Sequence, residues 1–198
     1  MINIFQKHQI IDQELDFKIK CDSQSLSFYC DIESFISDHI PGIRAVSVLD
    51  VGARTASGTA LLRAIHHPRS FARLKFHEVT ALDLDVKSIE KARNEFPDIE
   101  YMTVDIGKLK GVRKWNLVLS SHTIEHVQDP DSFVRSLEDV SDYCVIIACP
   151  FLEENLIPGH HHRFNIDFFE KRGFSFTRIY RSMHWHGGVA CISIKFIR

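Results

Sequence analysis

Three acids stand at positions where the sequence predicts strands to end. Asp50, Asp83 and Asp105 each close a run of apolar and β-branched residues. In an open parallel sheet, ligands bind outside the carboxyl ends of the strands. Carboxylates there can accept hydrogen bonds from an ammonium group, from ribose hydroxyls and from an exocyclic amine. One such acid is equally consistent with a helix N-cap or a turn, but three in succession indicate a ligand site.

Histidines form two further groups. The segment "HTIEH", His122 to His126, matches H-x-x-E-H, a zinc-hydrolase pattern in which two histidines and Glu125 could share a helix face. The segment "PGHHHRFN" carries His160 to His162 in a long connection, and loops at the carboxyl ends of strands handle substrates. A neutral histidine can accept a proton near pH 7. The alternative is a polar loop whose histidines cap Asp167 or face water.

The elements that would position these residues alternate along the chain. From Ile43 onward, short apolar runs alternate with amphipathic stretches, which predicts an α/β fold with a parallel sheet. The predicted strands are residues 43–50, 77–84, 99–106, 116–121 and 143–149, and the predicted helices are residues 57–67, 86–96, 129–140 and 165–174. Asp129 and Pro130 are the expected N-cap and first helical residue of the third of these helices.

The two ends of the chain depart from this alternation. Residues 174–183 and 189–198 predict an antiparallel hairpin around Gly187 and Gly188, with His184 and His186 facing solvent at its turn. Residues 15–20 and 26–40 predict a short strand and a helix that Pro41 and Gly42 close.

Composition narrows the class of protein. The chain has 198 residues, 44% of them hydrophobic and 25% charged, which suits one soluble domain with a substantial core. A net charge of -2 argues against a protein that mainly holds a nucleic-acid backbone. Five scattered cysteines without a C-x-x-C pair fit reduced thiols in a cytoplasm. Neither a signal peptide nor a membrane span is expected.

In order and spacing, these motifs resemble the class I S-adenosylmethionine-dependent methyltransferases, from Ile43 to Arg198. "VLDVGARTASGTALL" is similar to the first motif of that family, and "VTALDLDVKSIEKAR" to the second, in which Asp83 would hold both ribose hydroxyls. "YMTVDI" resembles the third, where Asp105 would face the adenine amine and Ile106 would pack on the ring. "NLVLSSHTIEHVQDPDSFVRSLEDV" is similar to the fourth strand and the following helix of the small-molecule branch.

The resemblance implies a fold and a site. The fold would be Rossmann-like and doubly wound, with a mixed seven-stranded sheet of order 3-2-1-4-5-7-6 whose last strand is antiparallel. Residues 43–198 would form the S-adenosylmethionine-binding domain, and residues 1–42 a helical cap segment. The implied cofactor-binding residues are Asp50, Gly52, Ala53, Arg54, Asp83, Leu84, Asp105, Ile106 and Ser121. The implied catalytic candidates are His122, His161 and His162, of which His122 follows the strand that lies closest to the sulfonium, and no metal is expected.

The first motif departs from the family at two positions. Arg54 and Ala56 stand where further glycines usually allow a close approach to the cofactor or a positive φ. A left-handed residue other than glycine costs on the order of 1 kcal/mol, so the departure does not by itself abolish binding. The guanidinium of Arg54 either faces the methionine carboxylate or is a solvated loop group. A nicotinamide fingerprint fails, because a count from Gly52 places Arg54 and Ser57 at its other two glycine positions.

The expected function is methyl transfer to a small molecule at oxygen or nitrogen. A hydroxyl or carboxyl acceptor is favoured, because "SSHT" follows the fourth strand in place of the Asn-Pro-Pro-Tyr signature of amine methylation. One alternative is a non-catalytic binding or regulatory protein with a degenerate glycine loop, and another is a metal hydrolase that uses "HTIEH". The acceptor must be capped by residues 1–40, by the His160 connection or by another subunit, so a homodimer is compatible with the sequence. Neither a nucleic acid nor a membrane is an expected partner.

Overall fold

Seven strands of the described part of the chain form one mixed sheet whose order is the predicted one. The computed structural model describes residues 22–42, 44–182 and 188–197, so the strand predicted at residues 15–20 and the histidines of the hairpin turn lie outside the described residues. In sheet order, the strands are β3 (Glu100–Met102), β2 (Leu74–Leu82), β1 (Arg44–Val51), β4 (Trp115–Ser121), β5 (Ser141–Pro150), β7 (Val189–Phe196) and β6 (Phe176–Arg181). All neighbouring pairs are parallel except those of β7, which is antiparallel to both β5 and β6.

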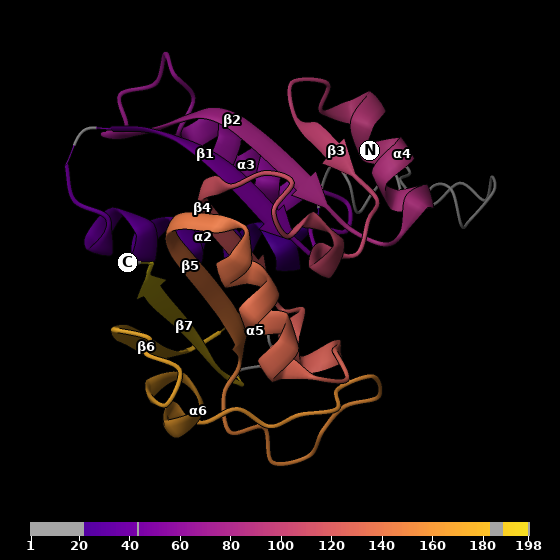
Figure 1. The fold of residues 1–198 in the computed structure, drawn as a ribbon, viewed down its shortest axis with the longest axis vertical. Helices are drawn as coiled ribbons and strands as arrows, with labels where there is room; N and C mark the ends of the chain where they lie inside the picture. Colours follow the sequence, from indigo (N-terminus) through magenta and orange to yellow (C-terminus); the bar gives the residue numbers. More distant parts are fainter. Residues whose placement is uncertain (1–21, 43, 183–187, 198) are drawn as a thin grey trace, which may run out of the picture.

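Helices cover both faces of this sheet (Figure 1). The α-helices are α2 (Ser23–His39), α3 (Ser57–Ile65), α4 (Val86–Glu95), α5 (Pro130–Asp139) and α6 (Ile166–Glu170), and two 3-10 helices are η1 (Ile106–Leu109) and η2 (Ile124–His126). The predicted start of α5 is confirmed, because the Asp129 side chain accepts a hydrogen bond from the backbone N–H of Ser132 and Pro130 is the first helical residue.

Alternating strand residues divide the interior into two hydrophobic clusters. Val48 in β1 and Leu117 in β4 point into the cluster that α2, α3 and α4 cover. Their neighbours Leu49 and Val118 point into the opposite cluster, which α5 and α6 cover. Because side chains of successive strand residues point to opposite faces, continuous apolar runs are what a sheet buried on both sides requires.

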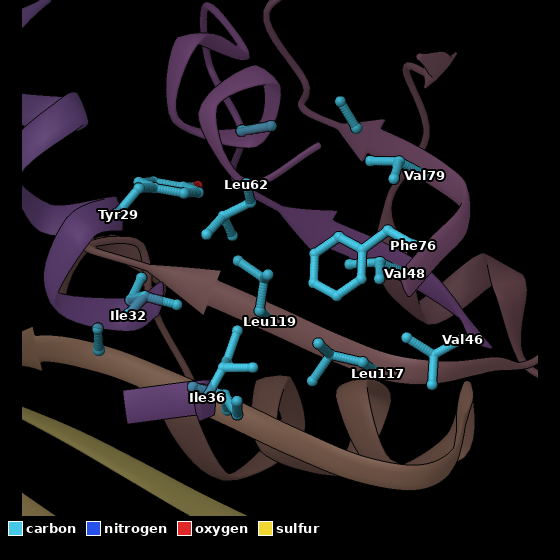
Figure 2. Packing of buried hydrophobic residues seen from close by; sticks show 14 of the residues in the cluster. Tyr29, Ile32, Ile36, Val46, Val48, Leu62, Phe76, Val79, Leu117 and Leu119 are labelled. Carbon is cyan, nitrogen blue, oxygen red and sulfur yellow. The ribbon is translucent and has the colours of Figure 1, made fainter. Parts of the chain in front are cut away.

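The N-terminal helix α2 is part of the first cluster. Its buried side chains, among them Tyr29, Ile32 and Ile36, pack toward Leu62 of α3 and Leu119 of β4 (Figure 2). Asp22 caps the helix by accepting a hydrogen bond from the backbone N–H of Ser25 at 3.0 Å. The helix predicted at residues 26–40 therefore begins three residues earlier and ends at His39.

Several elements differ from the prediction, among them the helix expected at residues 165–174, which is only Ile166–Glu170. The strand expected at residues 99–106 is only Glu100–Met102, because the Asp105 side chain accepts a hydrogen bond from Gly107 N at 2.8 Å and starts the tight helix η1. The "HTIEH" segment contains only the three-residue η2, and His122 precedes it, so its histidines do not share an α-helical face. In the described part of the chain, no helix combines the length and apolar character that a membrane crossing requires.

Candidate functional site

The loop after β1 adopts the left-handed conformations that glycine-rich loops use. Its φ angles are 83° at Gly52, 50° at Arg54 and 55° at Ala56, so the two residues that replace glycines carry the expected positive φ. Backbone N–H groups of Gly52 and Ala53 both donate to the carbonyl of Leu82 at the end of β2, at 2.8 and 3.1 Å. The loop therefore keeps a glycine-type shape at a cost on the order of 1 kcal/mol for each substituted position.

Gly52 is required by packing as well as by its backbone. A Cβ atom at this position would lie 2.0 Å from Oγ1 of Thr123 and 2.8 Å from its Cγ2. Thr123 follows β4 and precedes η2, so the absence of a side chain at Gly52 brings the ends of β1 and β4 into direct contact.

Asp83 lies just beyond β2, and backbone groups orient its half-buried carboxylate. One oxygen accepts from the N–H of Arg54 at 2.7 Å, and the other accepts from the N–H of Asp85 at 2.9 Å. An ionised carboxylate has about four acceptor sites, so two remain after these bonds. The arrangement fits a pair of neighbouring hydroxyls such as those of a ribose.

Asp50 is fully buried, and its carboxylate accepts hydrogen bonds from hydroxyls of this chain. Tyr29 donates to its two oxygens at 2.9 and 2.8 Å, and Thr59 donates to one of them. Burial raises the pKa of Asp50 to about 7, while the hydrogen bonds from Thr59 and Tyr29 oppose that rise. The first strand-end acid therefore joins α2, the loop and α3, and it lies beneath the surface of the site.

A cavity of about 210 Å³ opens beside this loop. Its lining residues come from α2, from the loop after β1, from the end of β4 with η2, and from the connection after β5; they are Gln24, Ser25, Phe28, Tyr29, Gly52, Ala53, Arg54, Gly58, Ser121, His122, Glu125, His126, Ile157 and His160. Five of the predicted site residues are brought together here: Gly52, Ala53, Arg54, Ser121 and His122. A larger depression of about 520 Å³ beside α3 contains none of the predicted site residues.

His122 occupies a constrained position in the cavity wall. Its backbone is left-handed, with a φ of 50°, a conformation that costs a residue other than glycine on the order of 1 to 3 kcal/mol. The imidazole stacks on Phe28 of α2 with ring centroids 3.8 Å apart, and its Nδ1 lies 3.5 Å from Oε1 of Glu125. Ser121 precedes it, and among the described residues the buried Ser121 hydroxyl has no hydrogen-bond partner. The end of β4 therefore presents a ring and a hydroxyl to a ligand.

The two histidine groups meet in space, with different members from those the sequence indicated. Glu125, His126 and His160 place one potential metal-ligand atom each within 4.8 Å of one another. The exposed His161 donates its backbone N–H to the carbonyl of Glu125 at 2.8 Å, and Nε2 of His162 donates to the carbonyl of Val127 at 2.9 Å. The cavity lining includes His160 but neither His161 nor His162.

The remaining predicted residues lie at the ends of β2 and β3. Leu84 follows Asp83 and is 68% exposed, which is unusual for a large apolar side chain and gives a flat ring a surface to pack on. Ile106 is buried at the start of η1, and the exposed Asp105 carboxylate accepts from Gly107 N. These three residues are not among those that line the cavity, so they would serve a different part of a ligand.

Sequence reasoning missed the contribution of α2. Phe28 and Tyr29 line the cavity and contact His122 and Asp50, but in the sequence they are ordinary apolar residues of an amphipathic helix. His126 and His160 had a signal, since both belong to the two histidine groups, yet no spacing rule joins residues 34 positions apart in the chain.

Comparisons with known proteins agree with this fold. Residues 49–142, somewhat less than half of the chain, match a family model described as a methyltransferase domain. The magnesium protoporphyrin IX methyltransferase of Synechocystis, solved with bound SAH, is 16% identical, with a TM-score of 0.62 over 98% of this chain and 91% of that one. The DhpI–SAH complex is 18% identical, with a TM-score of 0.60 over 97% and 99% of the two chains. DesVI of Streptomyces venezuelae is 12% identical, with a TM-score of 0.65 over 96% and 100%. No curated protein matches the chain in sequence.

Proposed function

We propose that the chain is a class I S-adenosylmethionine-dependent methyltransferase and that it methylates a small molecule at an oxygen of a hydroxyl or carboxyl group. The observation that carries the proposal is the cavity beside the loop after β1, where His122 and Ser121 meet Gly52, Ala53 and Arg54. The structurally similar magnesium protoporphyrin IX methyltransferase is named for a small-molecule acceptor, which supports a small-molecule acceptor for this chain.

The cofactor would lie along the carboxyl ends of β1, β2 and β3. We assign the ribose to Asp83, because two backbone N–H groups hold its carboxylate in a fixed orientation. We assign the methionine end to Gly52, Ala53 and Arg54. The adenine end is assigned to Leu84, Asp105 and Ile106. Asp50 acts one layer below as a positioning residue, because Tyr29 and Thr59 use its carboxylate to fix the loop. When bound, S-adenosylmethionine supplies a methyl group on a sulfonium that an aligned acceptor displaces in line.

His122 is the proposed catalytic residue. Its imidazole lines the cavity, and Glu125 lies 3.5 Å from its Nδ1, where a carboxylate stabilises the imidazolium that forms when the ring accepts a proton. For a hydroxyl acceptor, the ring would take the hydroxyl proton as the acceptor oxygen replaces the sulfur at the methyl carbon, with the C–S bond breaking as the C–O bond forms. For a carboxylate acceptor no proton is removed, and the ring and the Ser121 hydroxyl orient the oxygen. His161 and His162 lie outside the cavity lining and have no assigned step.

The segment of residues 1–42 is proposed as a cap over the acceptor. Its helix α2 contributes Gln24, Ser25, Phe28 and Tyr29 to the cavity wall, so part of the enclosure comes from this chain itself. Residues 43–198 would then form the cofactor-binding domain. A homodimer, a cytoplasmic location and the absence of a nucleic-acid partner stay predictions from the sequence.

Thermal unfolding with the cofactor product tests the proposal. S-adenosylhomocysteine at millimolar concentration is expected to raise the melting temperature of the wild type, because a ligand that binds only the folded state stabilises it. Asp83→Ala should abolish this rise by removing the acceptor of the ribose hydroxyls. The control is Asp139→Ala, a half-buried acid at the end of α5 that pairs with Lys110 at 3.1 Å, and this variant should keep the full rise. A wild type that shows no rise would contradict the assignment of the site.

A further inference from the structure

We propose that Glu125, His126 and His160 form a binding site for a divalent transition-metal ion at the acceptor end of the cavity. Glu125 and His126 come from η2, and His160 comes from the connection after β5. One ligand atom from each residue lies within 4.8 Å of the others, so small side-chain rotations suffice to place all three around one ion. All three residues also line the cavity that holds His122.

The state of Glu125 is the first argument for an ion. Its side chain is 1% exposed, and among the described residues neither carboxylate oxygen accepts a hydrogen bond. Nδ1 of His122, at 3.5 Å, is beyond the range of a good hydrogen bond. A buried carboxylate without donors is strongly destabilising, and a cation bound to it removes that cost. An ordinary buried hydrogen-bond network would have satisfied these oxygens.

The orientation of the two imidazoles is the second argument. Nδ1 of His126 donates to the carbonyl of Gly159 at 2.9 Å, and Nδ1 of His160 donates to Oε2 of Glu153 at 2.6 Å. Metal-ligating histidines characteristically donate their other ring N–H to a backbone carbonyl or a carboxylate, which sets the tautomer and the ring orientation. Both partners act through Nδ1, so Nε2 is the ligand nitrogen in each ring.

Glu153 is itself held in place. Its Oε1 accepts a hydrogen bond from the backbone N–H of Ile157 at 3.1 Å while Oε2 engages His160. The carboxylate side chain is only 10% exposed. The arrangement therefore has the outer layer of interactions that fixes a metal ligand before the ion arrives.

The ligand set indicates the kind of ion. Two imidazoles and one carboxylate suit zinc and similar transition-metal ions, whereas magnesium and calcium prefer oxygen ligands alone. Three protein ligands leave a coordination position open in sites of this type. If the chain methylates a small molecule as proposed above, that position would take an oxygen of the acceptor. The inference then narrows the acceptor to small molecules with a metal-binding hydroxyl or carboxylate.

Direct metal binding tests the site independently of catalysis. Untagged full-length protein, freed of metal with a chelator, is titrated with Zn²⁺ by calorimetry, and with Co²⁺ by its visible absorption. We expect one Zn²⁺ for each chain. The variant His126→Gln changes an exposed side chain, and Glu125→Gln is isosteric, so both should fold; each should bind Zn²⁺ at least about 100-fold more weakly, since loss of a supporting residue alone costs about 10- to 100-fold.

Two further variants complete the design. Glu153→Gln should weaken Zn²⁺ binding about 10- to 100-fold by releasing His160. His77→Gln, an exposed histidine in β2, should bind as the wild type does. A wild type without stoichiometric Zn²⁺, or a His126→Gln variant that binds as tightly as the wild type, would overturn the site. A wild type that fails to bind Zn²⁺ but keeps the melting-temperature rise from S-adenosylhomocysteine would overturn this inference and leave the proposed function standing.

Discussion

The hydroxyl of Tyr29 donates to both carboxylate oxygens of Asp50, at 2.9 and 2.8 Å, and joins the N-terminal helix α2 to the end of β1. Gly58 allows this contact, because a Cβ atom there would lie 2.3 Å from the Tyr29 ring. Phe28, the preceding residue, stacks on His122 at the end of β4. Two successive side chains of α2 therefore contact the first and fourth strand ends, which makes the helix part of the site.

Tyr29→Phe is expected to destabilise the fold by about 1 to 3 kcal/mol. The variant keeps the ring but removes the hydroxyl, which leaves the buried Asp50 carboxylate with Thr59 as its side-chain donor. The free energy of unfolding from urea denaturation measures the effect. Tyr143→Phe is the matched control, since this half-buried ring packs edge-on against Phe196, and it should change the free energy by less than about 0.5 kcal/mol. Equal losses in the two variants would contradict the role of the Tyr29 hydroxyl.

The raised pKa of Asp50 predicts a specific dependence of stability on pH. Because burial raises the folded-state pKa from 3.8 to about 7, the folded chain binds more protons than the unfolded chain between these values. The contribution of Asp50 to stability is therefore fully present below the unfolded pKa and is lost as pH rises through the folded pKa. Between about pH 5 and pH 8, the loss should amount to about 2 to 3 kcal/mol.

Comparison with Asp50→Asn isolates this contribution. The variant has no titratable group at position 50 but keeps every other ionisable group. As pH rises, the wild type should therefore lose free energy of unfolding relative to the variant. Urea denaturation at several pH values measures it. A difference that stays constant with pH would show that Asp50 has a similar pKa in the folded and unfolded chain.

Most of the fold follows from local patterns. Continuous apolar runs predicted β1, β2, β4 and β5, because strands buried on both faces need apolar residues at successive positions. The strand order did not follow from those patterns and came from the resemblance. The length of β3 was wrong because Asp105 turns its side chain back onto Gly107 N and starts η1, a competition between a cap and a strand that composition does not decide.

Some residues of the candidate site also follow from local patterns, and others do not. Residues next to strand ends, such as Asp83 and His122, could be found because their position follows from the strands that hold them. The roles of Tyr29 and His160 could not, since each depends on packing between segments far apart in the chain. Within the run of three histidines, only the path of the connection decides that His160 lines the cavity while His162 donates to the carbonyl of Val127.

Gly52→Ala is expected to cost about 2 to 4 kcal/mol. The φ of 83° costs any L side chain on the order of 1 kcal/mol. The new Cβ would also overlap the Thr123 side chain, and such overpacking adds about 1 to 3 kcal/mol. Gly111→Ala separates the two effects. Gly111 has a φ of 73° with nothing within 4 Å of its Cβ position, so this variant should cost only about 1 kcal/mol. If Gly52→Ala and Gly111→Ala lower the free energy of unfolding by the same amount within error, an overlap with Thr123 does not contribute to the cost at Gly52.

Arg54→Ala decides between the two interpretations of that residue. The backbone N–H that orients Asp83 is retained, and alanine already adopts the same left-handed conformation two residues later at Ala56. Only the guanidinium is lost. If it faces the methionine carboxylate, one charge-assisted interaction worth about 1.5 to 3 kcal/mol disappears, and S-adenosylhomocysteine should bind about 10- to 100-fold more weakly in calorimetry. Arg73→Ala, in the exposed loop before β2, should leave the affinity unchanged. An Arg54→Ala variant with the affinity of the wild type would show that the guanidinium is solvated and that the backbone of the loop alone holds the methionine end.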